Sequence, residues 1–340
     1  MGVITGMGLA ECGEMSSLQS TVPLVGVERS TQSAFARWKA NAQCPACGSD
    51  ACAGRAGLPD RNYTFGSEHV TYPEQGIALV ECGGCGLYYK SALPTPQFLA
   101  SVFRREAQTK WASSHDFLPE AALLRKLCGG APFDLLDVGA GDGRLLWACG
   151  QVGLTGRRSA FDVMHYQGIE RHLTGEFIEG FLDDPLPAWS QERYDIVTLF
   201  DVLEHLYDPG QAFENLRCLL REGGLVFIET GDSASFWPRR IGINHWWYAR
   251  LLEHHVFWRR RSIAQIAAAH GFRIVYWREV RHKSRRQLIP QRTVIDSLKT
   301  GIYLASKNHY ASIAQSIGRQ GMQPWYPFAV DHFQACLVKE

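Results

Sequence analysis

The sequence lacks several features that would decide its class at once. No run of about 18 apolar residues occurs, so no membrane-spanning helix is expected. The first residues, MGVITGMGLAECGEMSS, have neither a basic stretch nor a long apolar core, so they do not resemble a secretory signal. Ten cysteines in 340 residues are too few for a disulfide scaffold. We therefore expect a cytoplasmic protein with reduced thiols.

The chain also lacks a strong net charge, because its formal charge is only +1. No general attraction to nucleic acid or to anionic lipid is expected from that value. The charge is nevertheless uneven. Residues 239–292 hold twelve arginines and one lysine against two acids, Glu253 and Glu279, and so carry +11. This basic segment could bind a substrate phosphate or, less favoured, a nucleic acid.

Composition shifts divide the chain into four parts. They are a mobile leader rich in Gly, Ser and Thr, a cysteine-containing ribbon, a helical connector and an α/β domain, over residues 1–38, 39–92, 93–130 and 131–340 respectively. After Pro132, short apolar runs alternate with helical segments, which is typical of a largely parallel sheet. We predict seven strands, with residues 283–325 forming a helical insertion before the last one.

A glycine loop follows the first predicted strand of this domain. Leu135-Leu136-Asp137-Val138 runs directly into Gly139-Ala140-Gly141-Asp142-Gly143, and then a helix is expected. Glycines let the backbone turn sharply and approach a ligand closely, and the helix N-terminus offers free N–H groups. A dinucleotide fingerprint would need a third glycine at position 144, which is Arg144. The loop therefore favours a cofactor headed by an amino acid over one headed by a pyrophosphate.

Further segments continue the pattern in order. Asp162 ends the second predicted strand, where a carboxylate can accept both hydroxyls of a ribose. The later segments are YDIVTLFDVLEHLYDP, CLLREGGLVFIET and EHHVFW followed by IAAAHGFRIV. Together with DVGAGDGRLL, they resemble class I methyltransferases that use S-adenosylmethionine (SAM), including ubiquinone-biosynthesis-like enzymes. The resemblance implies a Rossmann-like fold with a seven-stranded sheet.

The same resemblance assigns cofactor-binding roles. It implies that the glycine loop with Asp137 holds the methionine end of SAM, that Asp162 and Val163 lie at the ribose, and that Phe181 and Leu182 flank the adenine. Phe200, Asp201 and His205 would lie on the methionine side. The cofactor-binding residues expected in this way are Asp137, Gly139, Ala140, Gly141, Gly143, Asp162, Val163, Phe181, Leu182, Phe200, Asp201 and His205.

Two cysteine pairs precede this domain. Cys44 and Cys47 form one CxxCG motif, and Cys82 and Cys85 form the other. Four thiolates in two such motifs are typical of a closed, structural zinc site. Redox dithiols are the alternative, but those usually lie at a helix N-terminus. Cys52 is interpreted as a bystander. The combination resembles a subfamily in which a small zinc ribbon precedes the SAM domain, and several members of it methylate sugars or other small metabolites.

The acceptor side should be formed by residues after the fourth and fifth strands of the domain. Related sugar C-methyltransferases carry a Tyr-His-Glu-His cluster after strand five. Here Glu253-His254 matches the Glu-His pair, whereas the expected Tyr is displaced to Tyr248. Histidine is the natural base near neutral pH. The candidate catalytic residues are His254, backed by Glu253, with Tyr248 and His255.

These observations predict a SAM-dependent methyltransferase with a structural zinc ion. Its acceptor would be a hydroxyl or an activated carbon of a small natural product or of a sugar, which could be linked to a nucleotide or a phosphate. Two alternatives stay open: a nucleic-acid methyltransferase that uses the ribbon and the basic segment, and a non-catalytic SAM-fold binding module. The chain lacks an Asn/Asp-Pro-Pro-Tyr type of loop after strand four, which disfavours the first alternative.

Overall fold

A computed structural model describes residues 37–65, 68–110, 115–186, 191–281, 290–306, 310, 312 and 329–340. The leader expected over residues 1–38 lies almost entirely outside this part of the chain. So does most of the insertion expected over residues 283–325, except for helix α8 (Pro290–Ala305). No helix in the described ranges is long and apolar enough to span a lipid bilayer.

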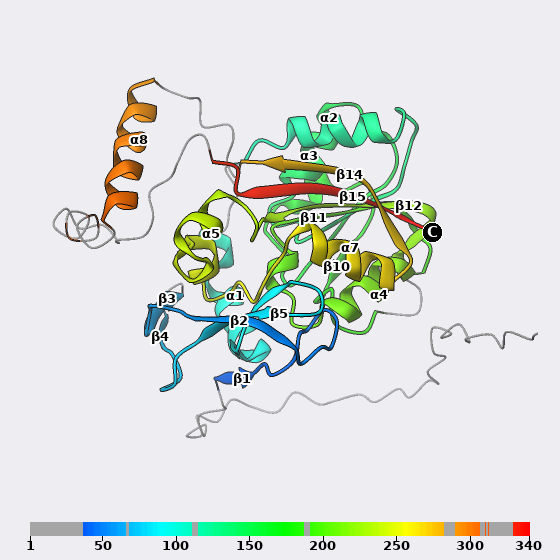
Figure 1. Cartoon of the computed structure of the whole chain (residues 1–340). Coiled ribbons are helices and arrows are strands. Elements are labelled where there is room, and N and C mark those ends of the chain that lie inside the picture. The colour runs from blue at the N-terminus through cyan, green and yellow to red at the C-terminus, as the bar shows by residue number, and fades with distance from the viewer. Residues whose placement is uncertain are drawn as a thin grey trace, which may run out of the picture.

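A seven-stranded sheet forms the centre of the α/β domain (Figure 1). Its strand order is β10-β9-β8-β11-β12-β15-β14. All pairings are parallel except those of β15, which runs antiparallel to both β12 and β14. The strands are β8 (Leu135–Val138), β9 (Arg158–Asp162), β10 (Phe177–Glu179), β11 (Tyr194–Phe200), β12 (Leu220–Gly231), β14 (Phe272–Val280) and β15 (His332–Lys339). The predicted seven-stranded Rossmann-like fold is therefore confirmed.

Helices cover both faces of the sheet because side chains alternate along each buried strand. In β8, Leu135 joins the core under α2 (Leu118–Leu127) and α3 (Arg144–Gln151), whereas Leu136 joins the core under α4 (Pro209–Leu219) and α7 (Arg260–Ala269). Figure 1 shows the two pairs of helices on opposite sides of the sheet. The first helix, α1 (Pro96–Lys110), and α2 both lie within residues 93–130, for which a helical connector was predicted.

The cysteine-rich segment forms small antiparallel sheets, one of which includes a strand from the α/β domain. Strands β1 (Trp38–Ala40) and β7 (Ala92–Pro94) pair with each other, as do β3 (Asn62–Phe65) and β4 (Glu68–Thr71). Strands β2 (Cys52–Gly57), β5 (Ala78–Cys82) and β6 (Tyr88–Lys90) form the main ribbon sheet. The fourth strand of that sheet is β13 (Val256–Phe257), which comes from the segment after β12. The ribbon and the α/β domain are thus joined by backbone hydrogen bonds.

Short helices follow β12 and complete this junction. They are α5 (Phe236–Ile241), η4 (Ile243–His245) and α6 (Trp247–Arg250). Two further short helices, η1 (Ile169–His172) and η3 (Leu203–His205), lie elsewhere in the domain. Buried side chains of α5 and α6, such as Trp237 and Tyr248, share one hydrophobic core with ribbon residues such as Leu79. This common core fixes the ribbon against the segment that carries the candidate catalytic residues.

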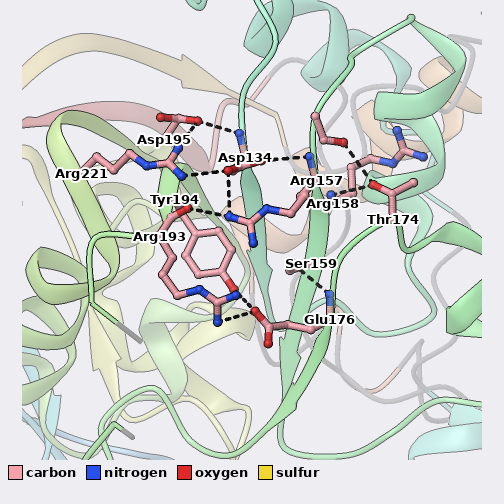
Figure 2. Close-up of polar contacts among 11 residues, drawn as sticks. Asp134, Arg157, Arg158, Ser159, Thr174, Glu176, Arg193, Tyr194, Asp195 and Arg221 are labelled. Carbon is pink, nitrogen blue, oxygen red and sulfur yellow. Dashed lines mark hydrogen bonds and ion pairs between the residues drawn. The ribbon is translucent and has the colours of Figure 1, made fainter. Parts of the chain in front are cut away.

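The amino ends of the parallel strands are tied together by ion pairs (Figure 2). The Asp134 carboxylate, just before β8, accepts hydrogen bonds from the guanidinium groups of Arg157 at 2.8 Å and Arg221 at 2.9 Å. Arg221 also pairs with Asp195 at 2.7 Å. Because the arginines lower it, the pKa of Asp134 lies well below its ordinary value. The negative charges of Asp134 and Asp195 at this edge are therefore paired with arginines.

Candidate functional site

The glycine loop adopts the geometry that its spacing predicts. Gly139, Gly141 and Gly143 have φ values of 70°, 53° and 77°, in the left-handed region that favours glycine. A Cβ atom on Gly139 would lie 2.5 Å from a methyl group of Val202, whereas one on Gly141 would meet no atom within 4 Å. Gly143 precedes α3, and no side chain caps that helix. The loop therefore leaves open space and an uncapped helix N-terminus, as a bound carboxylate requires.

Two buried aspartates flank this loop at the carboxyl ends of β8 and β9. Asp137 accepts a hydrogen bond from the Thr198 hydroxyl at 2.7 Å, and burial raises its pKa to about 7. Asp162 accepts one from the Gly141 amide at 2.8 Å, and burial raises its pKa to about 6. Asp162 therefore both shapes the glycine loop and presents a carboxylate beside it.

The remaining expected cofactor residues lie at or near the same edge of the sheet. Leu182 is buried in the core next to β10, Ala140 is buried, and Phe181 and Val163 are half-buried. The Phe200 ring lies 5.4 Å from that of Phe117, which precedes α2 and which the sequence pattern did not single out. Asp201 is exposed and has a φ of 53°, an uncommon backbone state for a residue other than glycine. Such strain occurs often at functional sites.

A buried hydrogen-bond network lies on the expected acceptor side. The Glu204 carboxyl group is fully buried and accepts hydrogen bonds from the Tyr248 hydroxyl at 2.5 Å and the Thr230 hydroxyl at 2.7 Å. One atom each of Glu204, His205 and His254 that could coordinate a metal ion lies within 4.8 Å of the other two. Because both Glu204 oxygens already accept hydrogen bonds, we interpret this group as a polar network and not as a second metal site.

His254 lies against this network. Its ring is 4.1 Å from the Tyr248 ring and 4.8 Å from the His205 ring. Its Nδ1 atom is buried and has no hydrogen-bond partner among the described residues. Burial, followed by the charges of His205 and Lys90, lowers the pKa of His254 well below its ordinary value. The imidazole is consequently neutral near pH 7, as a proton acceptor must be.

Glu253 lies close to both the acceptor-side network and the ribbon. Its carbonyl oxygen lies 2.9 Å from Nδ1 of His205, and its negative charge, after burial, raises the pKa of Tyr63 in the ribbon. The expected support of the His254 imidazole by the Glu253 carboxyl group stays a prediction. The neighbouring His255 is fully buried, and its backbone N–H donates to the Glu204 carbonyl at 2.6 Å. His255 therefore links the loop to η3.

His332 was missed in the sequence, since it lies on the last strand, far from every motif. It is fully buried at the start of β15, with Asp331 at 3.1 Å and Asp201 at 3.6 Å. Burial lowers its pKa, but Asp331 and Asp201 outweigh this and raise the pKa well above its ordinary value. Its ring is 5.1 Å from that of Tyr248. An Asp-His pair opening a buried strand was the available signal.

The four predicted cysteines come together at one point of the ribbon. Their sulfur atoms all lie within 4.8 Å of one another, with the Cys44–Cys85 and Cys47–Cys82 pairs each 3.6 Å apart. A tetrahedral zinc site with bonds of ~2.3 Å places its sulfurs about 3.8 Å apart, so this donor set fits zinc. Cys52 lies outside the group, and its thiol donates to the Gly54 carbonyl. The expected ligand set is thus brought together.

Several arginines of the basic segment contact the ribbon. Arg259 donates to Glu81 and to the Gly86 carbonyl beside the second cysteine motif, and Arg261 donates to the Gly84 carbonyl. Arg250 makes two hydrogen bonds to Asp60. These three arginines join the ribbon to the segment after β12.

Comparison with known proteins now identifies the family. A methyltransferase-domain family model matches residues 103–276, which is half of the chain. The chain therefore belongs to this methyltransferase family. Its membership confirms the expected relationship to class I SAM-dependent methyltransferases.

Among curated proteins, ubiquinone biosynthesis O-methyltransferases resemble this chain. The one from Haemophilus ducreyi is 31% identical over 104 residues, covering 28% of this chain and 44% of that protein. The one from Glaesserella parasuis is 31% identical over 144 residues, covering 38% and 61% respectively. The chain thus spans about half the length of the curated relatives it matches.

Solved structures of methyltransferases also resemble it at low identity. The Burkholderia thailandensis 1,6-didemethyltoxoflavin-N1-methyltransferase has a TM-score of 0.46 at 15% identity, covering 82% of this chain and 99% of that one. The Haemonchus contortus phosphoethanolamine N-methyltransferase 2 has a TM-score of 0.47 at 17% identity, covering 74% and 63%.

Proposed function

We propose that this protein transfers the methyl group of SAM to a hydroxyl group of a small molecule. The observation that carries the proposal is the neutral, buried imidazole of His254, which lies in the loop after the fifth parallel strand of a methyltransferase fold. Family membership supports the cofactor, and the O-methyltransferases among the relatives support the hydroxyl acceptor.

The carboxyl ends of β8, β9 and β10 would hold the cofactor. The glycine loop and Asp137 would bind its methionine end, Asp162 its ribose, and Phe181 with Leu182 its adenine. The open space at Gly141 and the buried Asp162 carboxylate fit this assignment. When bound, SAM supplies an electrophilic methyl group, so the protein has to position the acceptor and receive its proton.

His254 would receive that proton as the new oxygen–carbon bond forms. Because the pKa of His254 lies well below its ordinary value, the imidazole is unprotonated near pH 7 and can accept a proton. The same low pKa makes it a weak base. A weak base is best matched to an acidic hydroxyl, such as a phenol with a pKa near ~10. We therefore place phenolic acceptors first and sugar hydroxyls second, with an activated carbon as a third option.

The test uses zinc-loaded protein and SAM carrying a labelled methyl group. Label should pass to members of a panel of phenols and catechols more readily than to nucleotide sugars. His254→Ala should retain SAM affinity in calorimetry and lose about 10²-fold in turnover, as expected for loss of a general base. His165→Ala, at an exposed position, is the matched control. Absence of SAM binding by the native protein would overturn the proposal, and unchanged turnover in His254→Ala would move the base elsewhere.

A further inference from the structure

A lysine of the ribbon lies directly against the loop that carries His254. Lys90 is fully buried at the end of β6, although lysine is among the residues least often buried. Its ammonium group donates to the carbonyl oxygens of Leu251 and Leu252, the latter at 3.4 Å. Its backbone N–H donates to the His255 carbonyl at 3.0 Å. The loop is therefore held from one ribbon residue by both side chain and backbone.

The carbonyl that Lys90 contacts is the one that closes the turn. The Leu251 oxygen also accepts the backbone N–H of His254 at 3.3 Å. One acceptor is thereby shared between the turn itself and the lysine. The adjacent pairing of β6 with β13, Tyr89 opposite Val256, extends this contact beyond the turn. Without the ammonium group, the Leu251 oxygen would keep only the hydrogen bond from the His254 N–H at 3.3 Å.

Burial of a charged amine is unfavourable unless opposite charges lie near it. For Lys90, burial lowers the pKa to about 7, opposed by the carboxylates of Glu253 and Asp60. Near neutral pH an appreciable fraction of Lys90 is therefore positively charged. An apolar side chain would fill this space without that cost, so the position of a lysine here calls for a role.

We propose that Lys90 is a positioning residue, through which the ribbon holds the turn from Leu251 to His255 and orients the His254 imidazole against Tyr248. This inference rests on the proposed function of His254. It assigns the ribbon a direct part in the acceptor site, beyond the binding of its metal.

The charge of Lys90 gives the proposal a second, independent consequence. The groups that face His254 are Lys90, His205, His255 and the Tyr248–Glu204 pair. Three causes lower the pKa of His254: burial is the largest, the charge of His205 is second and the charge of Lys90 is third. Removing that charge should therefore let His254 take up a proton at a higher pH.

Two substitutions separate the hydrogen bond from the charge. Lys90→Met removes both, whereas Lys90→Gln keeps a donor and removes only the charge. Hydrogen exchange at the His254 and His255 amides should accelerate at least ~10-fold in Lys90→Met, equivalent to one hydrogen bond of about 1.4 kcal/mol, and less in Lys90→Gln. Both variants should protonate His254 at a higher pH than native protein in an NMR titration. Lys39→Met, at an exposed ribbon position, is the control.

Native exchange rates in Lys90→Met, or a His254 titration in Lys90→Gln that superimposes on the native curve, would overturn the proposal. If Lys90→Met fails to fold, the titration of Lys90→Gln still decides the matter. These readouts need neither acceptor nor turnover, so they stand even if His254→Ala shows that His254 is not the base. Zinc content and SAM affinity should stay native in every variant that folds.

Discussion

Two aspartates at opposite ends of β8 show how differently the two edges of the sheet are built. Asp134, at the amino end, is surrounded by arginines that lower its pKa. Asp137, at the carboxyl end, is buried with the Thr198 hydroxyl, and its pKa rises to about 7. Only Leu135 and Leu136 therefore separate a carboxylate whose charged form is stabilised from one whose charged form is destabilised by burial.

The same difference extends along both edges. At the amino edge, Glu176 accepts from Arg193 at 2.7 Å and from the Tyr194 hydroxyl at 3.0 Å, so its charge is matched (Figure 2). In the loops beyond the carboxyl edge, buried atoms of Glu253 and His254 have no hydrogen-bond partner among the described residues. Unsatisfied buried polar groups reduce stability, so they are retained where function needs them. The amino edge stabilises the fold, and the carboxyl edge is where we propose that the cofactor binds and the reaction occurs.

The largest effect is expected from disrupting the zinc ribbon, which packs against the loops at the carboxyl edge of the sheet. Cys44→Ser removes one of the four thiolates, so it should abolish the binding of about one zinc ion per chain. The effect should be large because structural zinc contributes on the order of 10 kcal/mol to folding. Hydrogen exchange should then accelerate in β5, β6 and residues 248–257, while β8 and β9 stay protected. Metal analysis and exchange measurements test this. Cys52→Ser should keep its zinc, and equal loss in both variants would contradict the assigned ligand set.

A smaller effect is expected at the amino edge. Asp134→Ala removes the partner of two arginines and of the Arg157 backbone N–H, so it should reduce the free energy of unfolding by about 2 kcal/mol. SAM affinity should change less than twofold, since Asp134 is at the opposite end of the strand from the glycine loop. Urea denaturation and calorimetry provide the two values. A large loss of SAM affinity would break the division between the edges.

The last comparison between the two edges is a pair of opposite pH dependences. The pKa of Asp134 is lowered in the fold, so its contribution is present above pH ~4 and is lost as the pH falls further. The pKa of Asp137 is raised to about 7, so native protein holds that proton more tightly and stability falls as the pH rises from about 4 to about 7. Each slope is at most about 1.4 kcal/mol per pH unit. Unfolding measured from pH 3 to 8 should lose the first slope in Asp134→Asn and the second in Asp137→Asn.

Much of the carboxyl edge could be predicted because it depends on local patterns. The seven strands predicted after Pro132 are found in one sheet, and the glycine loop directly follows the first of them, β8. The glycine spacing fixed the positive φ values, and the CxxCG spacing fixed the cysteine group. In each motif the determining residues lie within a few positions of one another, so their spacing in the sequence determines the local backbone geometry.

The acceptor side could be predicted only in part, because it is formed by long-range pairings. Lys90 contacts Leu251 because β6 pairs with β13, and no pattern near residue 90 signals that pairing. The same junction brings the Glu253 carboxyl group near Tyr63 of the ribbon, and no pattern near residue 63 signals that contact. His332 joins the site only through the order of the strands.

The position of β15 has a consequence for synthesis of the protein. It lies between β12 and β14, so β14 has no partner in the sheet until residues 332–339 have been made. The chain cannot complete its sheet progressively as it emerges from the ribosome. Until then, the apolar side chains of β14 and the edge of β12 wait unpaired, which is the condition in which nascent chains aggregate or engage chaperones. The same late strand delivers His332, so the acceptor side should be the last part of the molecule to mature.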